Sequence, residues 1–216
     1  MMNDKGRKIK KRGIVFLCCA FLLLSLLNVT ADAREQVSVR DMAIINSGHE
    51  LLLYFRVSEP FTREMEEGIK NGIPVTFSFY IALHQQRSGW FDKEITSHHF
   101  ERSLEYDSLK DEYKIRMTGP EDQIVTRTSL EEAKDMMKEV NDFAVIDLAK
   151  LVPGGNYSIR AKVSLEKKTL PFNFQNIIPF WNLWEFETEL TEFNFIIPAS
   201  DRERQRKSGS GKPVDR

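Results

Sequence analysis

One stretch, residues 72–84, constrains the fold more than any other. Its odd positions from Ile73 to Leu83 are all apolar or aromatic, whereas most of its even positions are small or polar. This period of two is typical of a β-strand with one face buried against a core. Pro74 lies near the start, where a missing backbone N–H is tolerated. The pattern predicts a long strand with Phe77 and Phe79 in the core.

Further strands are expected on both sides of this one. Short apolar or alternating runs that are bounded by Gly, Asn, Ser or Pro are typical of antiparallel sheets. Such runs lie at residues 37–45, 51–57, 90–106, 112–117, 123–126, 143–148, 157–165 and 185–197. A turn centred on Ser88 and Gly89 would place Phe77 opposite Phe100 in the next strand, so that apolar residues face each other.

Two short helices are expected between the strands. Thr62 can cap a helix that ends before Gly72, with glutamates in its early turns. A second helix can begin at Thr128 or Ser129, each followed three residues later by a glutamate, and its apolar stripe extends to Val140. We interpret this Met-rich stripe as core rather than as a binding surface. The pattern favours a mainly β (α+β) fold, an antiparallel β-sandwich-like domain with two short inserted helices.

The N-terminal segment has the layout of a secretory signal peptide. Lysine and arginine occupy six of residues 5–12, residues 14–27 are uncharged and mostly apolar, and Ala31-Asp32-Ala33 follows. The apolar run is shorter than the roughly 20 residues of a stable membrane span, so cleavage after Ala33 and an uncleaved anchor both remain open. The protein is expected to be periplasmic, or anchored in the inner membrane and facing the periplasm.

Three regions follow from this reading. Residues 1–33 are a signal peptide or signal anchor, and residues 34–198 are the β-rich domain. Residues 199–216 are rich in Arg, Lys, Ser and Gly without an apolar pattern, which predicts a disordered tail.

Charge and cysteine content exclude several classes of function. Six of the 31 basic and two of the 32 acidic residues precede Arg34, which leaves 25 basic and 30 acidic residues and a net charge of about −5. An acidic body argues against nucleic acid as a partner. The two cysteines, Cys18 and Cys19, follow bulky residues in the leader, which disfavours lipid attachment. The rest of the chain therefore has no disulfide or cysteine metal site.

No catalytic, cofactor-binding or metal-binding residue is predicted. His98 and His99 are adjacent, so in a strand they point to opposite faces and cannot chelate one metal together. The sequence has no Gly-x-Ser-x-Gly nucleophile elbow. Gly154-Gly155 is too short to cradle phosphate and fits a turn instead.

An aromatic stretch near the end of the domain is the main candidate for contacts. It follows neither the strand nor the helix period. Such rings suit the headgroup layer of a membrane or a groove on a partner protein, or they could plug the core of the sandwich. The candidate contact residues are Phe172, Phe174, Phe180, Trp181 and Trp184.

Several motifs occur in a characteristic order across residues 37–197. They are Gly72-Ile73-Pro74, Trp90-Phe91-Asp92, Leu104-Glu-Tyr106-Asp-x-Leu109-x-x-x-Tyr113, Tyr157-x-Ile159-Arg160-x-Lys162, and Leu170-Pro171 with Trp184-Glu-Phe-Glu-Thr188. In this order they resemble an uncharacterised bacterial domain-of-unknown-function family of exported envelope proteins. The resemblance implies that the genes of such proteins often lie beside genes for membrane sensor kinases. A membrane sensor kinase is therefore a candidate partner. It implies no activity and no functional residues.

These observations predict an exported, non-enzymatic envelope module that binds a protein partner or the membrane surface and needs no cofactor. The alternative is an envelope hydrolase that acts on glycan or peptide. A hydrolase would require convergent polar side chains in a pocket.

Overall fold

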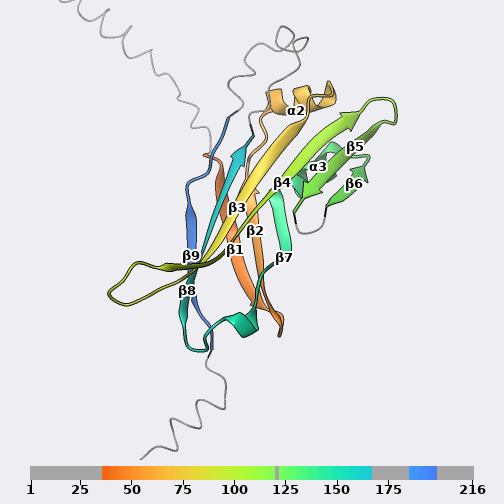
Figure 1. Cartoon of the computed structure of the whole chain (residues 1–216). Coiled ribbons are helices and arrows are strands. Elements are labelled where there is room, and N and C mark those ends of the chain that lie inside the picture. The colour runs from red at the N-terminus through yellow and green to blue at the C-terminus, as the bar shows by residue number, and fades with distance from the viewer. Residues whose placement is uncertain (1–35, 120–121, 167–184, 199–216) are drawn as a thin grey trace, which may run out of the picture. The chain divides into compact units, whose positions relative to one another are not determined.

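Two antiparallel sheets enclose a hydrophobic core in the computed structural model (Figure 1). The structure describes residues 36–119, 122–166 and 185–198. The chain separates into two units, Met1–Glu35 and Gln36–Arg216, and the described residues all belong to the second. The predicted mainly β, sandwich-like fold with two short helices is confirmed.

The smaller sheet has three strands in the order β1-β2-β7. They are β1 (Ser38–Asn46), β2 (Glu50–Ser58) and β7 (Glu139–Asp147). Alternate residues of β2 face the core, as the period of two predicts. Register shifts interrupt both edge strands, and Asp41 and Asp142 adopt left-handed backbone there, with φ of 55° and 54°. Bulges of this kind discourage an edge strand from pairing with another chain.

The larger sheet has six strands in the order β6-β5-β4-β3-β8-β9. They are β3 (Val75–Gln85), β4 (Lys93–Asp107), β5 (Glu112–Thr118), β6 (Gln123–Arg127), β8 (Asn156–Leu165) and β9 (Thr191–Ile196). The last strand is shorter than predicted, and the described residues just before it, 185–190, form an isolated bridge between Glu187 and Ser164. The stretch singled out in the sequence, β3, lies inside the sheet between β4 and β8.

The pairing of β3 with β4 differs from the prediction by two residues. Phe79, not Phe77, lies opposite Phe100. The loop is centred on Gly89 and not between Ser88 and Gly89, which moves the pairing by one residue. The register shift between Leu83 and His84 moves it by one more. Because an offset of two keeps every side chain on the same face, Phe77 and Phe79 are both fully buried, as predicted.

The two helices differ in how well the sequence predicts their ends. Helix α2 (Arg63–Lys70) is capped by Thr62, whose Oγ1 accepts a hydrogen bond from Met65 N at 3.3 Å. Helix α3 (Leu130–Lys138) begins directly after Ser129, as predicted, but the side chain of Ser129 does not form the capping hydrogen bond expected from the spacing of Ser129 and Glu132. Val140 is also wrongly placed in the helical stripe, because it belongs to β7, although the stripe is core as predicted. A short 3₁₀ helix, Leu148–Lys150, precedes β8.

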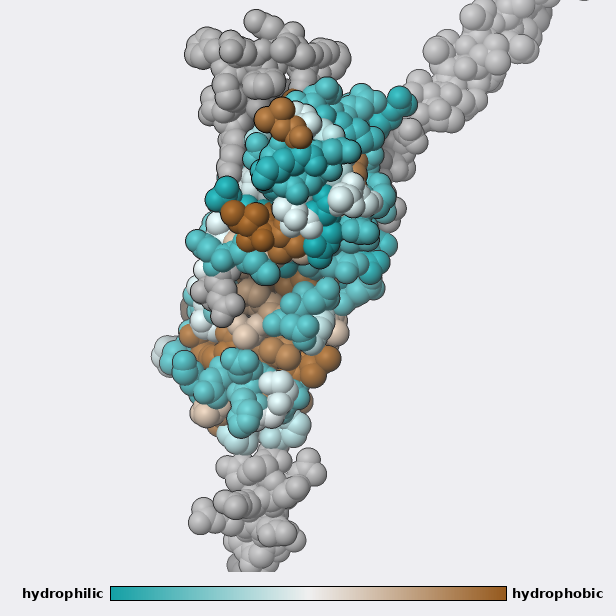
Figure 2. Space-filling view, turned by 90° about the vertical axis from the view of Figure 1, so that its right-hand side faces the viewer, coloured by the Kyte–Doolittle hydropathy of each residue, from teal (hydrophilic) through white to brown (hydrophobic). Residues whose placement is uncertain are grey.

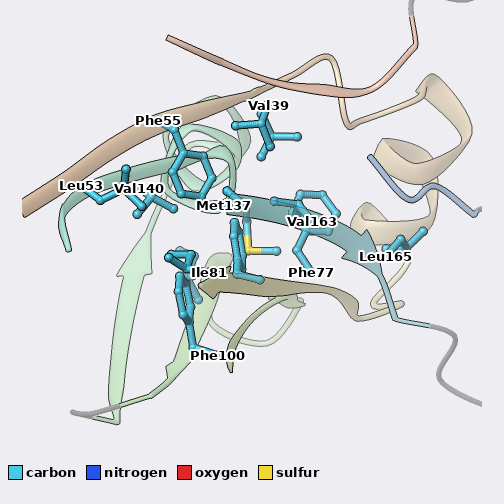
Figure 3. Close-up of a cluster of buried hydrophobic side chains, with 14 of the residues drawn as sticks. Val39, Leu53, Phe55, Phe77, Ile81, Phe100, Met137, Val140, Val163 and Leu165 are labelled. Atoms are coloured by element: carbon cyan, nitrogen blue, oxygen red, sulfur yellow. The ribbon is translucent and has the colours of Figure 1, made fainter. Parts of the chain in front are cut away.

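Aromatic rings join the two sheets across the core. Ring centroids are 6.3 Å apart for Phe55 and Phe79, 4.8 Å for Phe79 and Phe100, and 5.0 Å for Phe100 and Phe143. Phe55 and Phe143 come from the small sheet and the other two rings from the large one. Figure 3 shows two of these rings, Phe55 and Phe100, in the core together with Ile81 and Met137. The row of rings is therefore a main contact between the sheets.

The strands give the domain two distinct ends. The α2 end contains the start of β1, where Ser38 pairs with Ser58, and the end of β8, where Leu165 pairs with Phe77. The opposite end, called here the hairpin end, contains the β3–β4 loop and the end of β9, where Ile196 pairs with Asn156. Residue 36, where the described domain begins, therefore lies at the α2 end, and the β3–β4 loop lies at the other (Figure 1).

Candidate functional site

The aromatic residues predicted as contacts all lie outside the described residues. These are Phe172, Phe174, Phe180, Trp181 and Trp184. The described residues on either side of them are at the α2 end, where Leu165 N donates to Phe186 O at 2.9 Å and Glu166 N donates to Thr76 O at 2.8 Å. Whether those rings form contacts remains a prediction.

A serine and a histidine are paired on the outer face of the large sheet. Ser78 Oγ lies 2.7 Å from His99 Nε2, an arrangement that can activate a serine nucleophile. Ser78 is only 6% exposed, however, and the backbone of β3 around it pairs with β4 on one side and β8 on the other. The adjacent pair Thr76 and Ser103 forms the same kind of bond at 2.9 Å. Backbone N–H groups that are paired within a sheet cannot form an oxyanion hole. We therefore interpret Ser78 and His99 as a cross-strand polar contact and not as a catalytic pair.

His98 lies on the other face of β4, as predicted from its position next to His99. Its Nε2 is 2.8 Å from the backbone oxygen of Val145 in the small sheet. Within residues 36–119, 122–166 and 185–198, no three His, Cys, Asp or Glu side chains are grouped so that they could hold a metal ion.

A network of charged and amide side chains ties the base of the β3–β4 hairpin to β8 and β9. Arg160 Nε lies 3.2 Å from Glu192 Oε2, and its Nη2 lies 3.0 Å from Asp92 Oδ2. The hydrogen bond with Arg160 is the main reason why the pKa of Glu192 falls below its usual value. Gln86 Nε2 also donates to Asn194 Oδ1 at 2.6 Å. These contacts fix both strands at the base of the hairpin.

Two buried polar atoms lie close to this network. Ser158 Oγ and His84 Nδ1 have no hydrogen-bond partner among the described residues. Ser158 is near enough to Glu192 to help lower the pKa of that carboxyl, but the pair lacks hydrogen-bond geometry. His84 Nε2 is 3.8 Å from Glu94 Oε2. Ser158 is paired with His84 across the strands but is completely buried, so a substrate could not reach its hydroxyl as a nucleophile.

The apex of the same hairpin carries two exposed aromatic side chains. Trp90 is 82% exposed and Phe91 is 95% exposed, and we call this pair the aromatic tip. Gly89, with φ of 79°, takes the left-handed conformation that the turn before them requires. Arg87 and Lys93 on either side are exposed as well. Figure 1 shows the hairpin projecting away from the rest of the large sheet.

The aromatic tip differs from the other exposed apolar residues. Exposed apolar side chains that are scattered singly are normal on soluble proteins. On the face that Figure 2 shows, hydrophobic patches, the broadest of them in the lower half, lie among hydrophilic residues. The tip instead has two large rings that are adjacent in sequence and nearly free of contact. Large exposed aromatic surface usually marks an interface. The aromatic tip is therefore the candidate contact site in the described part of the chain.

Comparison with known proteins supports one part of the resemblance seen in the sequence, namely that to a domain of unknown function. Residues 34–194 match the model of a family described as Domain of unknown function (DUF4390). No curated protein matches the chain, and no solved structure does. None of the helices in the described residues is long and apolar enough to cross a membrane. Since the match spans well over half of the sequence, the chain belongs to the DUF4390 family of domains of unknown function.

Proposed function

We propose that the protein is an exported, non-enzymatic binding module of the cell envelope. It acts in the periplasm, or from an anchor in the inner membrane that faces the periplasm. Its partner is an envelope protein, such as a membrane sensor kinase, or the membrane surface. The observation that carries the proposal is the aromatic tip, whose two rings project from a hairpin held firmly at its base.

The contacts at the base of the hairpin support a binding role. Asp92 and Gln86 flank the loop and are held by Arg160 of β8 and Asn194 of β9. A loop that is ordered before binding loses less conformational entropy when it meets its partner. The tip is thus presented for contact at little additional cost.

The two buried serines, Ser78 and Ser158, give the hydrolase alternative no comparable support. Ser78 has a histidine partner but is nearly buried in the middle of a sheet. Ser158 is completely buried. Hydrolysis requires a nucleophile or an activated water that is open to the substrate, together with donors for the developing negative charge. Neither serine meets both conditions.

A reporter that is active only outside the cytoplasm tests the export part of the proposal. Residues 1–40 fused to such a reporter should give activity, because the basic and apolar segments have the order that directs export. The same fusion with Leu23→Arg should lose most of it, since a charge within the apolar run opposes insertion. An inactive parent fusion would rule out export. N-terminal sequencing of the exported product would then distinguish cleavage after Ala33 from an uncleaved anchor.

A photoreactive amino acid at position 91 tests the binding part. Such a residue reports what the tip touches in the cell, and position 109 supplies a control because Leu109 is equally exposed, at 96%, on a different turn.

A further inference from the structure

We infer that two copies of this chain associate through antiparallel pairing of their β9 strands, which joins two large sheets into one. This inference goes beyond the proposed function, because it concerns a surface other than the aromatic tip. Three properties of β9 lead to it, namely its open backbone edge, the contrast with the other sheet edges, and the order of its side chains.

The outer edge of β9 presents unpaired backbone groups. β9 ends the strand order of the large sheet, and its outer edge pairs with no strand in the described part of the chain (Figure 1). Ile197 N donates to Gly155 O at 3.2 Å, so the backbone of Ile197 faces β8. Alternate residues of an antiparallel strand direct their N–H and C=O groups to opposite edges. The residues of β9 that direct these groups outward are therefore Glu192, Asn194 and Ile196, and such a row matches the backbone of another extended strand.

The other sheet edges are protected against such pairing. Register shifts with left-handed residues interrupt β1 and β7. In β6, Arg127 Nη1 donates to Thr126 O at 2.7 Å, so a side chain already occupies a backbone acceptor of this edge strand. The pairing of β9 with β8 instead runs without a register shift along the whole strand. The charge of Glu192 in β9 is balanced by Arg160, whose Nε lies 3.2 Å from the carboxylate.

The side chains of β9 are ordered so that the strand fits a second copy of itself. A two-fold axis at Asn194 places Phe193 of each copy opposite Phe195 of the other and places Glu192 opposite Ile196. Aromatic rings then face each other across the strands, and like charges do not. In one copy, Phe193 is 37% exposed and Ile196 is 64% exposed. Pairing covers this apolar surface, and the match identifies a second copy as the occupant.

Disulfide cross-linking in the full-length chain tests the predicted register. Cys18→Ser and Cys19→Ser remove the native cysteines, and Asn194→Cys then introduces a single new one at the two-fold axis. The Cα atoms of two directly opposed residues lie about 5.5 Å apart, which suits a disulfide. After treatment of membranes with copper–phenanthroline, we expect at least fivefold more cross-linked dimer from Asn194→Cys than from the control described next.

The matched control is Ile196→Cys in the same cysteine-free chain. Position 196 is exposed on the same strand and the same face as position 194. In the predicted register, however, the two copies of position 196 lie about 13 Å apart, since each faces position 192 of the other copy. Cross-linking at position 196 that equals the cross-linking at position 194 would overturn the inference, because it would arise from random collision or another arrangement.

Sedimentation of the full-length chain in mild detergent, across a range of concentrations, measures the association itself. We expect a reversible dimer whose dissociation constant rises tenfold or more in Phe193→Lys, because a lysine that points inward from an edge strand opposes pairing. Asn194→Pro should act similarly, because it removes an outward N–H and leaves the bonds to β8 in place. Leu109→Lys makes the same kind of change on a distant turn, where Leu109 is 96% exposed, and should leave the constant unchanged. A parent chain that stays monomeric, or a dimer that neither β9 variant weakens, would refute the inference.

Discussion

Replacing Phe79 with alanine should lower the free energy of unfolding by about 4 kcal/mol, as expected when a large side chain is removed from a packed core. Phe79 is completely buried, and its ring lies between Phe55 of the small sheet and Phe100 of the large one. The substitution would therefore leave a cavity where the two sheets meet. Denaturant unfolding followed by circular dichroism measures the change.

The control for Phe79 is its neighbour on the opposite face of the same strand. Tyr80→Ala should cost about 1 kcal/mol or less, because Tyr80 is partly exposed on the outer face of the sheet. Similar losses for the two variants would show that the assignment of faces in β3 is wrong.

Substituting Arg102 with methionine should cost about 3 kcal/mol, which is the loss expected when buried carbonyls are deprived of a charged donor. Arg102 Nη1 donates to Met136 O at 2.6 Å and also to Glu139 O, so it satisfies carbonyls at the end of α3. Its guanidinium lies 5.3 Å from the ring centre of Phe79. Burial lowers the pKa of Arg102 to about 10, so the group remains charged at neutral pH.

Arg116 provides the control for Arg102, because it is an exposed arginine on β5. Arg116→Met should change the free energy of unfolding by less than about 0.5 kcal/mol. Replacing a buried charge with an apolar side chain is sometimes stabilising, because the cost of desolvation disappears. If Arg102→Met is as stable as the parent chain, the hydrogen bonds to α3 do not offset that cost, and the role given to Arg102 is wrong.

The alternation of side chains was enough to predict that the odd-numbered residues of β3 lie in the core, but it did not predict the exact partners of the strand. It also did not predict that Thr76, Ser78 and Ala82 on the other face are buried as well. A period of two is unchanged by an offset of two residues, and nothing in the pattern marks the register shift at Leu83 and His84. The end of α3 was missed for a related reason. Lys138 ends the helix and Glu139 begins β7 without a glycine or proline between them, so Val140 fits the helical and the strand period equally well.

The candidate site was harder to predict from the sequence than the fold. Trp90 and Phe91 stand out as a motif, but strand alternation would direct one of two adjacent residues into the core, and only the loop geometry exposes both. Arg160 meets Asp92 across 68 residues of sequence and Glu192 across 32. No local pattern reveals that these groups converge, because the strand order brings them together.

Photo-crosslinking in the cell from position 91 of the full-length chain tests the central claim most directly, namely that the aromatic tip is the contact surface of an exported binding module. We predict adducts with an envelope protein or with phospholipid from position 91, and none above background from position 109. The side chain of Leu109 is as exposed, but it lies on the turn of residues 108–111, which contains no aromatic residue. A folded, exported chain that gives no more adduct at position 91 than at position 109 would contradict the account.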